Sequence, residues 1–288
     1  MVHRKVLCLG HSHIGALRHA APELREKFQN IGLSFEVQSL FDDEFMPDTE
    51  AVSNSRPNRC GGVRKDFDLP QGAPRFWFGA AGHQHRLTGR AMDALMRLLR
   101  EKQPDMMVFL CRGNEHSIIS MLQHPMPFDF RIPGEDTALI DGAEELPFAL
   151  IKAQVAHFAA SHALLFWDFL NGLGRDVFDG PIHMLPPPPP ILSAQHILAH
   201  PSSFGSAAAA FGISPSALRA KVWQVYSGVL KDAVQKTNQP FINLPQTIFD
   251  DGCLAQKFWS KDPTHGNATY GKVILDHVLS EIHQQALA

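Results

Sequence analysis

Cysteine is scarce in this chain, with four thiols in 288 residues: Cys8, Cys60, Cys111 and Cys253. None of them forms a C-x-x-C pair, so zinc-ribbon and thioredoxin-like motifs are excluded. Cys8 and Cys111 lie inside apolar segments that resemble strands, and we expect both thiols to be buried. Scattered reduced thiols are typical of the cytoplasm, which is the location that the sequence predicts.

Long apolar runs and an excess of charge are also lacking. The run that comes closest to a membrane span, 148–170, is interrupted by polar residues, and the apolar stretch near the N-terminus is too short for a signal-peptide core. The net charge of -3 and the pI near 6.6 give no electrostatic reason to expect a nucleic acid or an anionic membrane as partner. We therefore expect a small-molecule substrate, and the oligomeric state stays open.

Signals for bound nucleotides are missing as well. Gly10 and Gly15 have the spacing of a P-loop, but the Lys-Ser/Thr pair that must follow is absent, and no Gly-x-Gly-x-x-Gly follows the first apolar segment. The sequence predicts no cofactor.

Strand-like and helix-like patterns alternate along most of the chain, which predicts an α/β protein. The expected strands are 5–9, 33–40, 75–78, 106–111, 181–185 and 241–244. The expected helices are 14–28, 87–101, 116–123, 145–170, 216–236 and 267–284. This order predicts a three-layer α/β/α sandwich with a flavodoxin-like parallel sheet of about five strands. We expect one domain over 1–288, with insertions at about 41–75 and 125–145.

Prolines give three local predictions. Pro22 is expected to kink or divide the first helix. Ser214 is expected to be the N-cap of the helix over 216–236, with Pro215 in its first turn. The run Pro186–Pro190 predicts a stiff extended loop, with a ligand for a proline-binding module as the alternative.

Three short motifs follow or end strand-like segments or precede the last helix: Gly10-His11-Ser12-His13, Gly113-Asn114-Glu115 and Asp262-Pro263-Thr264-His265. The carboxyl ends of parallel strands share one rim of the sheet, so these motifs are expected to meet there. A serine, an amide and an Asp/His pair are the groups that serine-based acyl transfer requires.

With these motifs the chain resembles the SGNH hydrolases, the GDSL-like esterase family. That family has Gly-x-Ser after the first strand, a glycine before the second major helix, Gly-x-Asn after the central strand and Asp-x-x-His near the C-terminus. Here the corresponding segments are 10–12, 79–82, 113–114 and 262–265. The resemblance spans nearly the whole chain.

The resemblance implies a role for each matched residue. Ser12 would be the nucleophile, His265 the general base and Asp262 the group that orients the imidazole. The oxyanion hole would consist of the backbone N–H groups of Ser12 and Gly82 and the side-chain amide of Asn114, with Gly79 as the alternative to Gly82.

The implied activity is the hydrolysis of a small carboxylic ester, an O-acetyl or short acyl group, with carbohydrates among the candidate carriers. An acyltransferase that uses the same residues is the alternative. Two positions depart from the family pattern, because His11 and Glu115 stand where the family usually has Asp.

Each motif also has a simpler structural interpretation. Ser12 could be the N-cap of the first helix, Asn114 a turn residue, and Asp262 or His265 a cap of the last helix. An SGNH-like domain without activity, serving only to bind, is a further alternative.

A metal site is the remaining alternative. Several histidines lie near expected strand ends: His11, His13, His83, His85 and His116. A metal-dependent phosphoesterase would also need bridging carboxylates, and the Asp-x-His motif expected on the first strand is missing. We therefore expect these histidines to line a polar cleft or to be exposed, and we expect no metal. A set of basic residues in the first insertion could bind an anionic or sugar-bearing substrate or simply be solvated: Arg56, Arg59, Arg64, Lys65 and Arg75.

Overall fold

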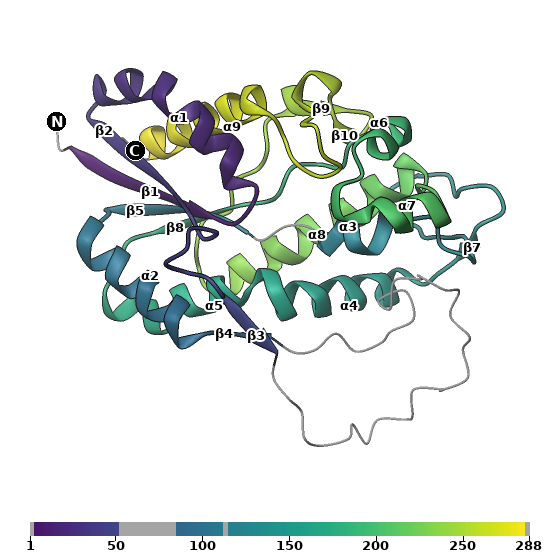
Figure 1. Ribbon diagram of the computed structural model, residues 1–288, viewed down its shortest axis with the longest axis horizontal. Coiled ribbons are helices and arrows are strands. Elements are labelled where there is room, and N and C mark those ends of the chain that lie inside the picture. Colours follow the sequence, from purple (N-terminus) through teal and green to yellow (C-terminus); the bar gives the residue numbers. More distant parts are fainter. Residues whose placement is uncertain (1–2, 52–84, 112–114, 286–288) are drawn as a thin grey trace, which may run out of the picture.

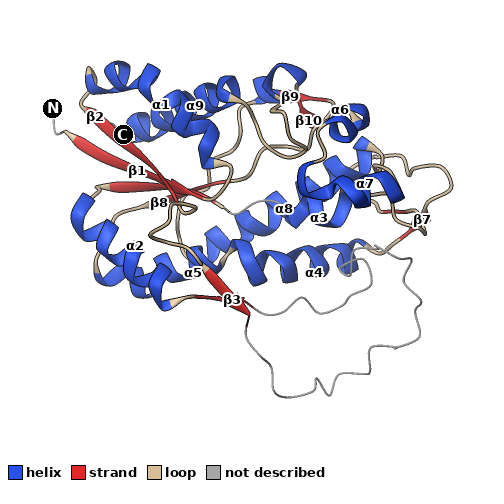
Figure 2. Cartoon of the chain, in the orientation of Figure 1, coloured by secondary structure: helices blue, strands red, loops and turns tan. Residues whose placement is uncertain are grey.

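The computed structural model describes residues 3–51, 85–111 and 115–285. Its centre is a four-stranded sheet in the order β2-β1-β5-β8, in which every pair of neighbours is parallel. The strands are β1 (Arg4–Gly10), β2 (Leu33–Ser39), β5 (Met106–Leu110) and β8 (Ile182–Leu185). Figures 1 and 2 show helices on both sides of this sheet, so the predicted α/β/α sandwich is confirmed.

The carboxyl ends of three strands are aligned. Gly10 of β1 pairs with Leu110 of β5, which in turn pairs with Leu185 of β8. Gly10 lies so close to β5 that a Cβ atom there would be 2.7 Å from the Cβ atom of Leu110, a distance that a larger residue could not tolerate. The glycine before Ser12 is therefore needed for the packing of β1 against β5 at this rim.

The expected fifth strand, 241–244, is reduced to one isolated bridge. Phe241 pairs with Met184 in the parallel sense, and Met184 exchanges backbone hydrogen bonds of 2.9 Å with Pro240 and Ile242. Pro240 and Pro245 enclose this segment and have no N–H to donate, which limits the ladder to this one position. The strand predicted at 75–78 lies outside the described residues.

Two helical layers cover the sheet. Figure 1 shows α1 (Ile14–Gln29) and α9 (Ala268–Gln285) together on one side. The opposite side carries α2 (Gly89–Lys102), α4 (Phe148–Phe158), α5 (Leu165–Asn171) and α8 (Ser216–Lys236).

Each layer encloses its own apolar core. In β1, Leu7 and Leu9 pack into the core on the α2 and α8 side, whereas Val6 and Cys8 pack into the core beneath α1 and α9. Such a strand, buried on both faces, reads as a continuous apolar run, as the sequence predicted.

The remaining helices depart in detail from the prediction. The pattern over 145–170 forms α4 and α5, and a π-helix at Ala159–Ala163 separates them. The segment after β8, expected to be irregular or weakly helical, contains α6 (Ala194–Ala199) and α7 (Gly205–Phe211). The helix α3 (Glu115–Ser120) is shorter than expected, and Pro22 lies within α1 without dividing it.

The predicted Ser214 cap is wrong. Pro215 is the N-cap of α8 and has no side-chain capping bond, while the Ser214 hydroxyl donates to the carbonyl of Ser120. A hydroxyl next to the start of a helix can either cap that helix or bond to a neighbouring segment. Here the hydroxyl of Ser214 bonds to the C-terminal residue of α3.

The insertions form short two-stranded pairs in their described parts. β3 (Thr49–Ala51) pairs antiparallel with β4 (His85–Leu87), and β6 (Phe128–Asp129) pairs parallel with β7 (Glu144–Glu145). A buried ion pair between Lys221 of α8 and Asp129 holds the second insertion to the helix layer. A further small hairpin joins β9 (Phe249–Asp250) to β10 (Cys253–Leu254).

The burial of side chains tests the predictions for the cysteines and for the proline run. Cys8 and Cys111 are buried as expected, and burial raises the pKa of the Cys8 thiol to about 12. All five residues of Pro186–Pro190 are buried and lie outside helices and strands. The segment is therefore a loop, as predicted, and its burial contradicts the alternative of an accessible proline ligand. Within the described ranges, no helix has the length and apolar character that crossing a bilayer requires.

The helices α1 and α9 approach each other very closely. A Cβ atom at Gly271 would be 1.9 Å from the carbonyl oxygen of Ala16, so the backbones of the two helices are in contact at this point. We predict that Gly271→Ala lowers the free energy of unfolding by about 1–3 kcal/mol, because the added methyl group forces the helices apart. Chemical denaturation of the purified variant measures this change.

The matched control is Gly228→Ala in α8, where an added Cβ atom meets nothing within 4 Å. Alanine has the higher helix propensity, so this variant is expected to gain up to about 1 kcal/mol. Equal effects of the two substitutions would contradict a special contact at Gly271.

Candidate active site

Ser12 lies in the turn between β1 and α1, and its hydroxyl is not used by the helix. The N-cap of α1 is His13, which makes no side-chain capping bond, and the turn is closed by the backbone bonds Ile14 N–His11 O (3.0 Å) and Gly15 N–Ser12 O (3.3 Å). The side chain of Ser12 is half-buried. The interpretation of Ser12 as an N-cap is therefore wrong.

Asp262 shapes the loop that carries His265. A single carboxylate oxygen, Oδ1, accepts hydrogen bonds from the backbone N–H groups of Thr264 and His265, both 2.8 Å, and lies 2.9 Å from Nδ1 of His265. The first of these bonds is an Asx-turn, which is the local role that the structural interpretation allowed. The same oxygen also fixes the orientation of the imidazole ring.

The last helix has a different cap. The side-chain oxygen of Asn267 accepts a hydrogen bond of 3.0 Å from the backbone N–H of Tyr270 in the first turn of α9. Neither Asp262 nor His265 makes this bond, so capping does not explain the Asp-x-x-His motif.

Ser12 and His265 line the same surface cleft, which has a volume of about 580 Å³. Residues around the start of α1 form one wall, and residues 259–261 and 266–268 form the other. Nε2 of His265 is buried and has no hydrogen-bond partner within the described ranges, so it is not bonded to the Ser12 hydroxyl in this structure. Catalytic hydrogen bonds are often absent or long until substrate is bound, so the arrangement is compatible with a nucleophile and its base.

The environment of Asp262 favours its charged form. Burial on its own raises the pKa of this carboxyl, but the hydrogen bond and the charge of His265, together with the N–H groups of Thr264 and His265, outweigh burial and hold the pKa well below its usual value. An ionised Asp262 requires a proton on Nδ1 of His265, and this leaves Nε2 of the neutral ring as the proton acceptor.

His13 contacts the ring of His265, a relation that the motifs did not predict. The two ring centroids are 4.5 Å apart, and the planes are tilted by 41°. His13 is 2 % exposed, and neither of its ring nitrogens has a hydrogen-bond partner among the described residues. The sequence placed His13 next to the nucleophile but could not show that its side chain turns toward the base.

The two departures from the family pattern are buried and make polar contacts. His11, in place of Asp, has Nε2 at 2.7 Å from Oδ2 of Asp48. Glu115, also in place of Asp, accepts a hydrogen bond of 2.9 Å from the hydroxyl of Tyr226. In both pairs the partner belongs to another part of the chain: Asp48 precedes β3, and Tyr226 lies in α8.

Three proposed oxyanion-hole positions cannot be placed. Gly79, Gly82 and Asn114 lie outside the described residues, as does the basic set of the first insertion at 56–75.

The expectation was that the histidines line a polar cleft or are exposed. His11, His13 and His116 are buried rather than exposed, and they are not among the residues that line the cleft of Ser12. In the part of the chain that the structure describes, no group of three or more His, Cys, Asp or Glu side chains is arranged to hold a metal ion. His83 lies outside that part.

Several residues at the rim of the cleft were not predicted from motifs. Trp259 is half-buried, and its indole N–H donates to the carbonyl of Leu254 at 2.7 Å, which fixes the ring. Lys261 is exposed at the same rim, and His19 of α1 is exposed on the opposite wall. Their proximity in sequence to the Asp-x-x-His motif and to Ser12 was the only available signal.

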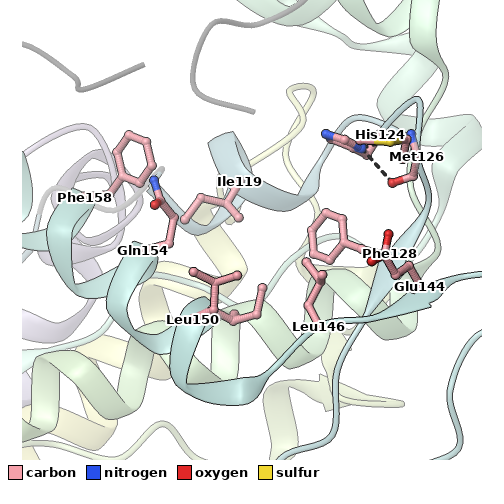
Figure 3. Close-up of a pocket in the computed structure, with 10 residues that line it drawn as sticks. Ile119, His124, Met126, Phe128, Glu144, Leu146, Leu150, Gln154 and Phe158 are labelled. Atoms are coloured by element: carbon pink, nitrogen blue, oxygen red, sulfur yellow. Dashed lines mark hydrogen bonds between the residues drawn. The ribbon is translucent and has the colours of Figure 1, made fainter. Parts of the chain in front are cut away.

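A second cavity, of about 280 Å³, is separate from this cleft and is not lined by Ser12 or His265. Figure 3 shows mainly apolar side chains from α3, α4 and the second insertion around it, among them Ile119, Phe128, Leu150 and Phe158. The dashed line in Figure 3 joins His124 to the carbonyl of Met126, a bond of 2.7 Å. Ser12 and His265 line the other cleft, so the two sites are distinct.

Comparisons with known proteins found only distant structural similarity. No family model matches the chain, and no curated protein is similar to it in sequence. A solved lipase/acylhydrolase from Enterococcus faecalis aligns over 98 % of this chain and 96 % of its own, with 11 % identity and a TM-score of 0.39. The periplasmic domain of a lipopolysaccharide acetyltransferase from Salmonella ser. Paratyphi A aligns over 97 % and 84 %, with 10 % identity and a TM-score of 0.39.

Similarity at this level does not assign an activity, so the functional argument rests on the residues of this chain.

The Asp262 loop gives a prediction for stability. We expect Asp262→Asn to lower the free energy of unfolding by about 1–3 kcal/mol at neutral pH, because an amide oxygen accepts the same hydrogen bonds less strongly. The folded-state pKa of Asp262 is depressed, so its contribution is present above the ordinary carboxyl pKa of about 4 and is lost as the pH falls below it. The difference between the variant and the wild type should therefore shrink in acid.

Denaturant unfolding at several pH values measures this difference. Asp276→Asn is the control, because Asp276 pairs with Lys27 on the surface and such pairs contribute about 0–1 kcal/mol. A pH-independent difference for Asp262→Asn would contradict the prediction.

Proposed function

We propose that this protein is a serine esterase of the SGNH type, which hydrolyses a small carboxylic ester through an acyl-enzyme. One observation carries the proposal: the Ser12 hydroxyl has no role in capping its helix and shares a cleft with a histidine whose Nδ1 is held by an ionised carboxylate. Nucleophile, base and orienting group come from opposite ends of the chain, which makes a purely local structural role a weak explanation for the set.

The first step forms the acyl-enzyme. The Ser12 oxygen attacks the ester carbonyl carbon while Nε2 of His265 takes its proton, and the C–O bond to the alcohol then breaks. The departing alcohol receives the proton from His265. Asp262 favours the charged imidazolium and keeps the proton of the neutral ring on Nδ1.

The negative charge on the carbonyl oxygen needs hydrogen-bond donors. We assign this role to the backbone N–H groups of Ser12 and Gly82 and to the side-chain amide of Asn114, with Gly79 as the alternative glycine. The assignment of the last three rests on the sequence motifs. One donor of this kind typically contributes about 2.7–4 kcal/mol to transition-state stability.

The cleft favours a short acyl group on a polar alcohol. Trp259 offers an immobilised aromatic ring and Lys261 a charged donor, whereas the mainly apolar cavity of Figure 3 is separate from Ser12. Aromatic rings and polar donors suit a sugar better than a long acyl chain. An O-acetylated carbohydrate is therefore the substrate class that we favour, and transfer of the acyl group to another alcohol would use the same residues.

The test is hydrolysis of p-nitrophenyl acetate and butyrate by wild type and by Ser12→Ala, with and without EDTA. We expect turnover to fall by about 10³-fold or more in the variant, because the covalent path is lost, and to be insensitive to EDTA. A fluorophosphonate probe should label the wild type at Ser12 and fail to label the variant.

Ser203→Ala, a substitution of an exposed serine outside the cleft, is the control and should retain full activity. Unchanged activity in Ser12→Ala, or activity abolished by EDTA, would disprove the serine mechanism.

A further inference from the structure

His13 and His265 place three unpartnered nitrogen atoms in one buried region next to Ser12. They are Nδ1 and Nε2 of His13 and Nε2 of His265, and the two rings are 4.5 Å apart between centroids. Buried polar atoms nearly always have hydrogen-bond partners, so a cluster of exceptions requires an explanation. One of these nitrogens belongs to the proposed base. A reacting molecule that can form hydrogen bonds to them would explain why they have no partner in the protein.

The protonation state of His13 defines what it can bind. Burial, followed by the neighbouring charge of His265 and that of His116, lowers its pKa well below the ordinary value. Asp262 opposes this shift and His11 adds to it. His13 is therefore a neutral imidazole with one N–H donor and one unprotonated nitrogen that accepts.

We propose that His13 is a catalytic residue of deacylation, in which its unprotonated nitrogen accepts a hydrogen bond from the water that attacks the acyl-enzyme. This inference rests on the proposed function. The same water gives its other proton to Nε2 of His265, so the two imidazoles hold it by both of its O–H groups. The two rings are 4.5 Å apart between centroids, and their free nitrogens are buried in this structure, so the water enters when the acyl group opens the space beside them.

The chemical step is balanced without any further reactant. The water oxygen forms a bond to the acyl carbon while one water proton moves to Nε2 of His265. The bond between the acyl carbon and the Ser12 oxygen then breaks, and His265 returns the proton to that oxygen. The products are the carboxylic acid and free Ser12, and His13 neither gains nor loses a proton.

This arrangement distinguishes water from an alcohol. Water has two O–H groups and can satisfy both imidazoles, whereas an alcohol has one, which the base must take. His13 therefore favours hydrolysis over transfer of the acyl group to an alcohol, and loss of its nitrogens should shift the balance toward transfer.

The experiment measures how the acyl group is divided between water and methanol. Wild type and His13→Phe are given p-nitrophenyl acetate in buffer with a fixed methanol concentration, and acetate and methyl acetate are quantified by NMR. Phenylalanine keeps a ring beside His265 but has no nitrogen. We expect the ratio of methyl acetate to acetate to rise by about fivefold, the factor that one neutral hydrogen bond typically provides.

Further variants make the result specific. His13→Asn has an amide oxygen that can accept the bond, so its ratio should return toward that of the wild type. His13→Leu has no hydrogen-bonding group, should show the same rise as His13→Phe, and serves if His13→Phe does not fold. His183→Phe is the matched control, because His183 on β8 is likewise buried with an unpartnered Nδ1, but among the described residues it is His13 whose ring contacts His265. Its ratio should equal that of the wild type.

The acyl group is partitioned between water and methanol only after the acyl-enzyme has formed. A variant whose fold or acylation is impaired therefore loses rate without a change in the ratio of methyl acetate to acetate. An unchanged ratio in His13→Phe, or in His13→Leu if His13→Phe does not fold, would overturn the role of His13 whatever the rates and leave the esterase proposal intact. Failure of the fluorophosphonate probe to label Ser12 in the wild type would instead refute the proposed function, and the inference with it.

Discussion

The backbone contact between α1 and α9 is the constraint on which the rest of the site depends. Ser12 lies two residues before α1, and His265 lies three residues before α9, so the relative position of these helices sets the relative position of the two side chains. The contact of Gly271 with the carbonyl of Ala16 is tighter than any side chain would permit. Two glycines, Gly10 against β5 and Gly271 against α1, thus determine where a serine from one end of the chain meets a histidine from the other.

One oxygen atom of Asp262 both stabilises the loop conformation and orients the proposed base. Its Oδ1 accepts from two backbone N–H groups of its own loop and holds the ring of His265. Burial of this carboxylate is unfavourable, and these bonds are what keep it ionised. The charge that favours an imidazolium is therefore also the charge that shapes the turn, so the loop conformation and the state of the base are linked through the same group.

The sequence predicted those parts of the fold that depend on continuous patterns. The buried runs at β1 and β5 and the motifs at their ends come from local composition. The structure places Ser12 and His265 in one cleft, with Asp262 bonded to His265. Features that depend on distant partners were not predictable. The Ser214 hydroxyl bonds to Ser120 instead of capping α8, and Phe241 forms a single bridge because prolines enclose it. The direction of the His13 side chain is likewise set by packing, on which its neighbours in sequence carry no information.

The departures from the family pattern show how buried polar groups connect the site to its surroundings. His11 follows β1 directly, and its partner Asp48 immediately precedes β3, so the pair links the nucleophile turn to the described edge of the first insertion. Phe41 packs edge-on against His11 at 3.8 Å between ring centroids, which shields this pair from water. An aspartate at position 11 would face Asp48 as a like charge, and two carboxylates so close cannot both ionise without a large penalty. Histidine at this position is therefore coupled to the acidic residue opposite it, and the substitution of either one alone would leave a buried polar group without its partner.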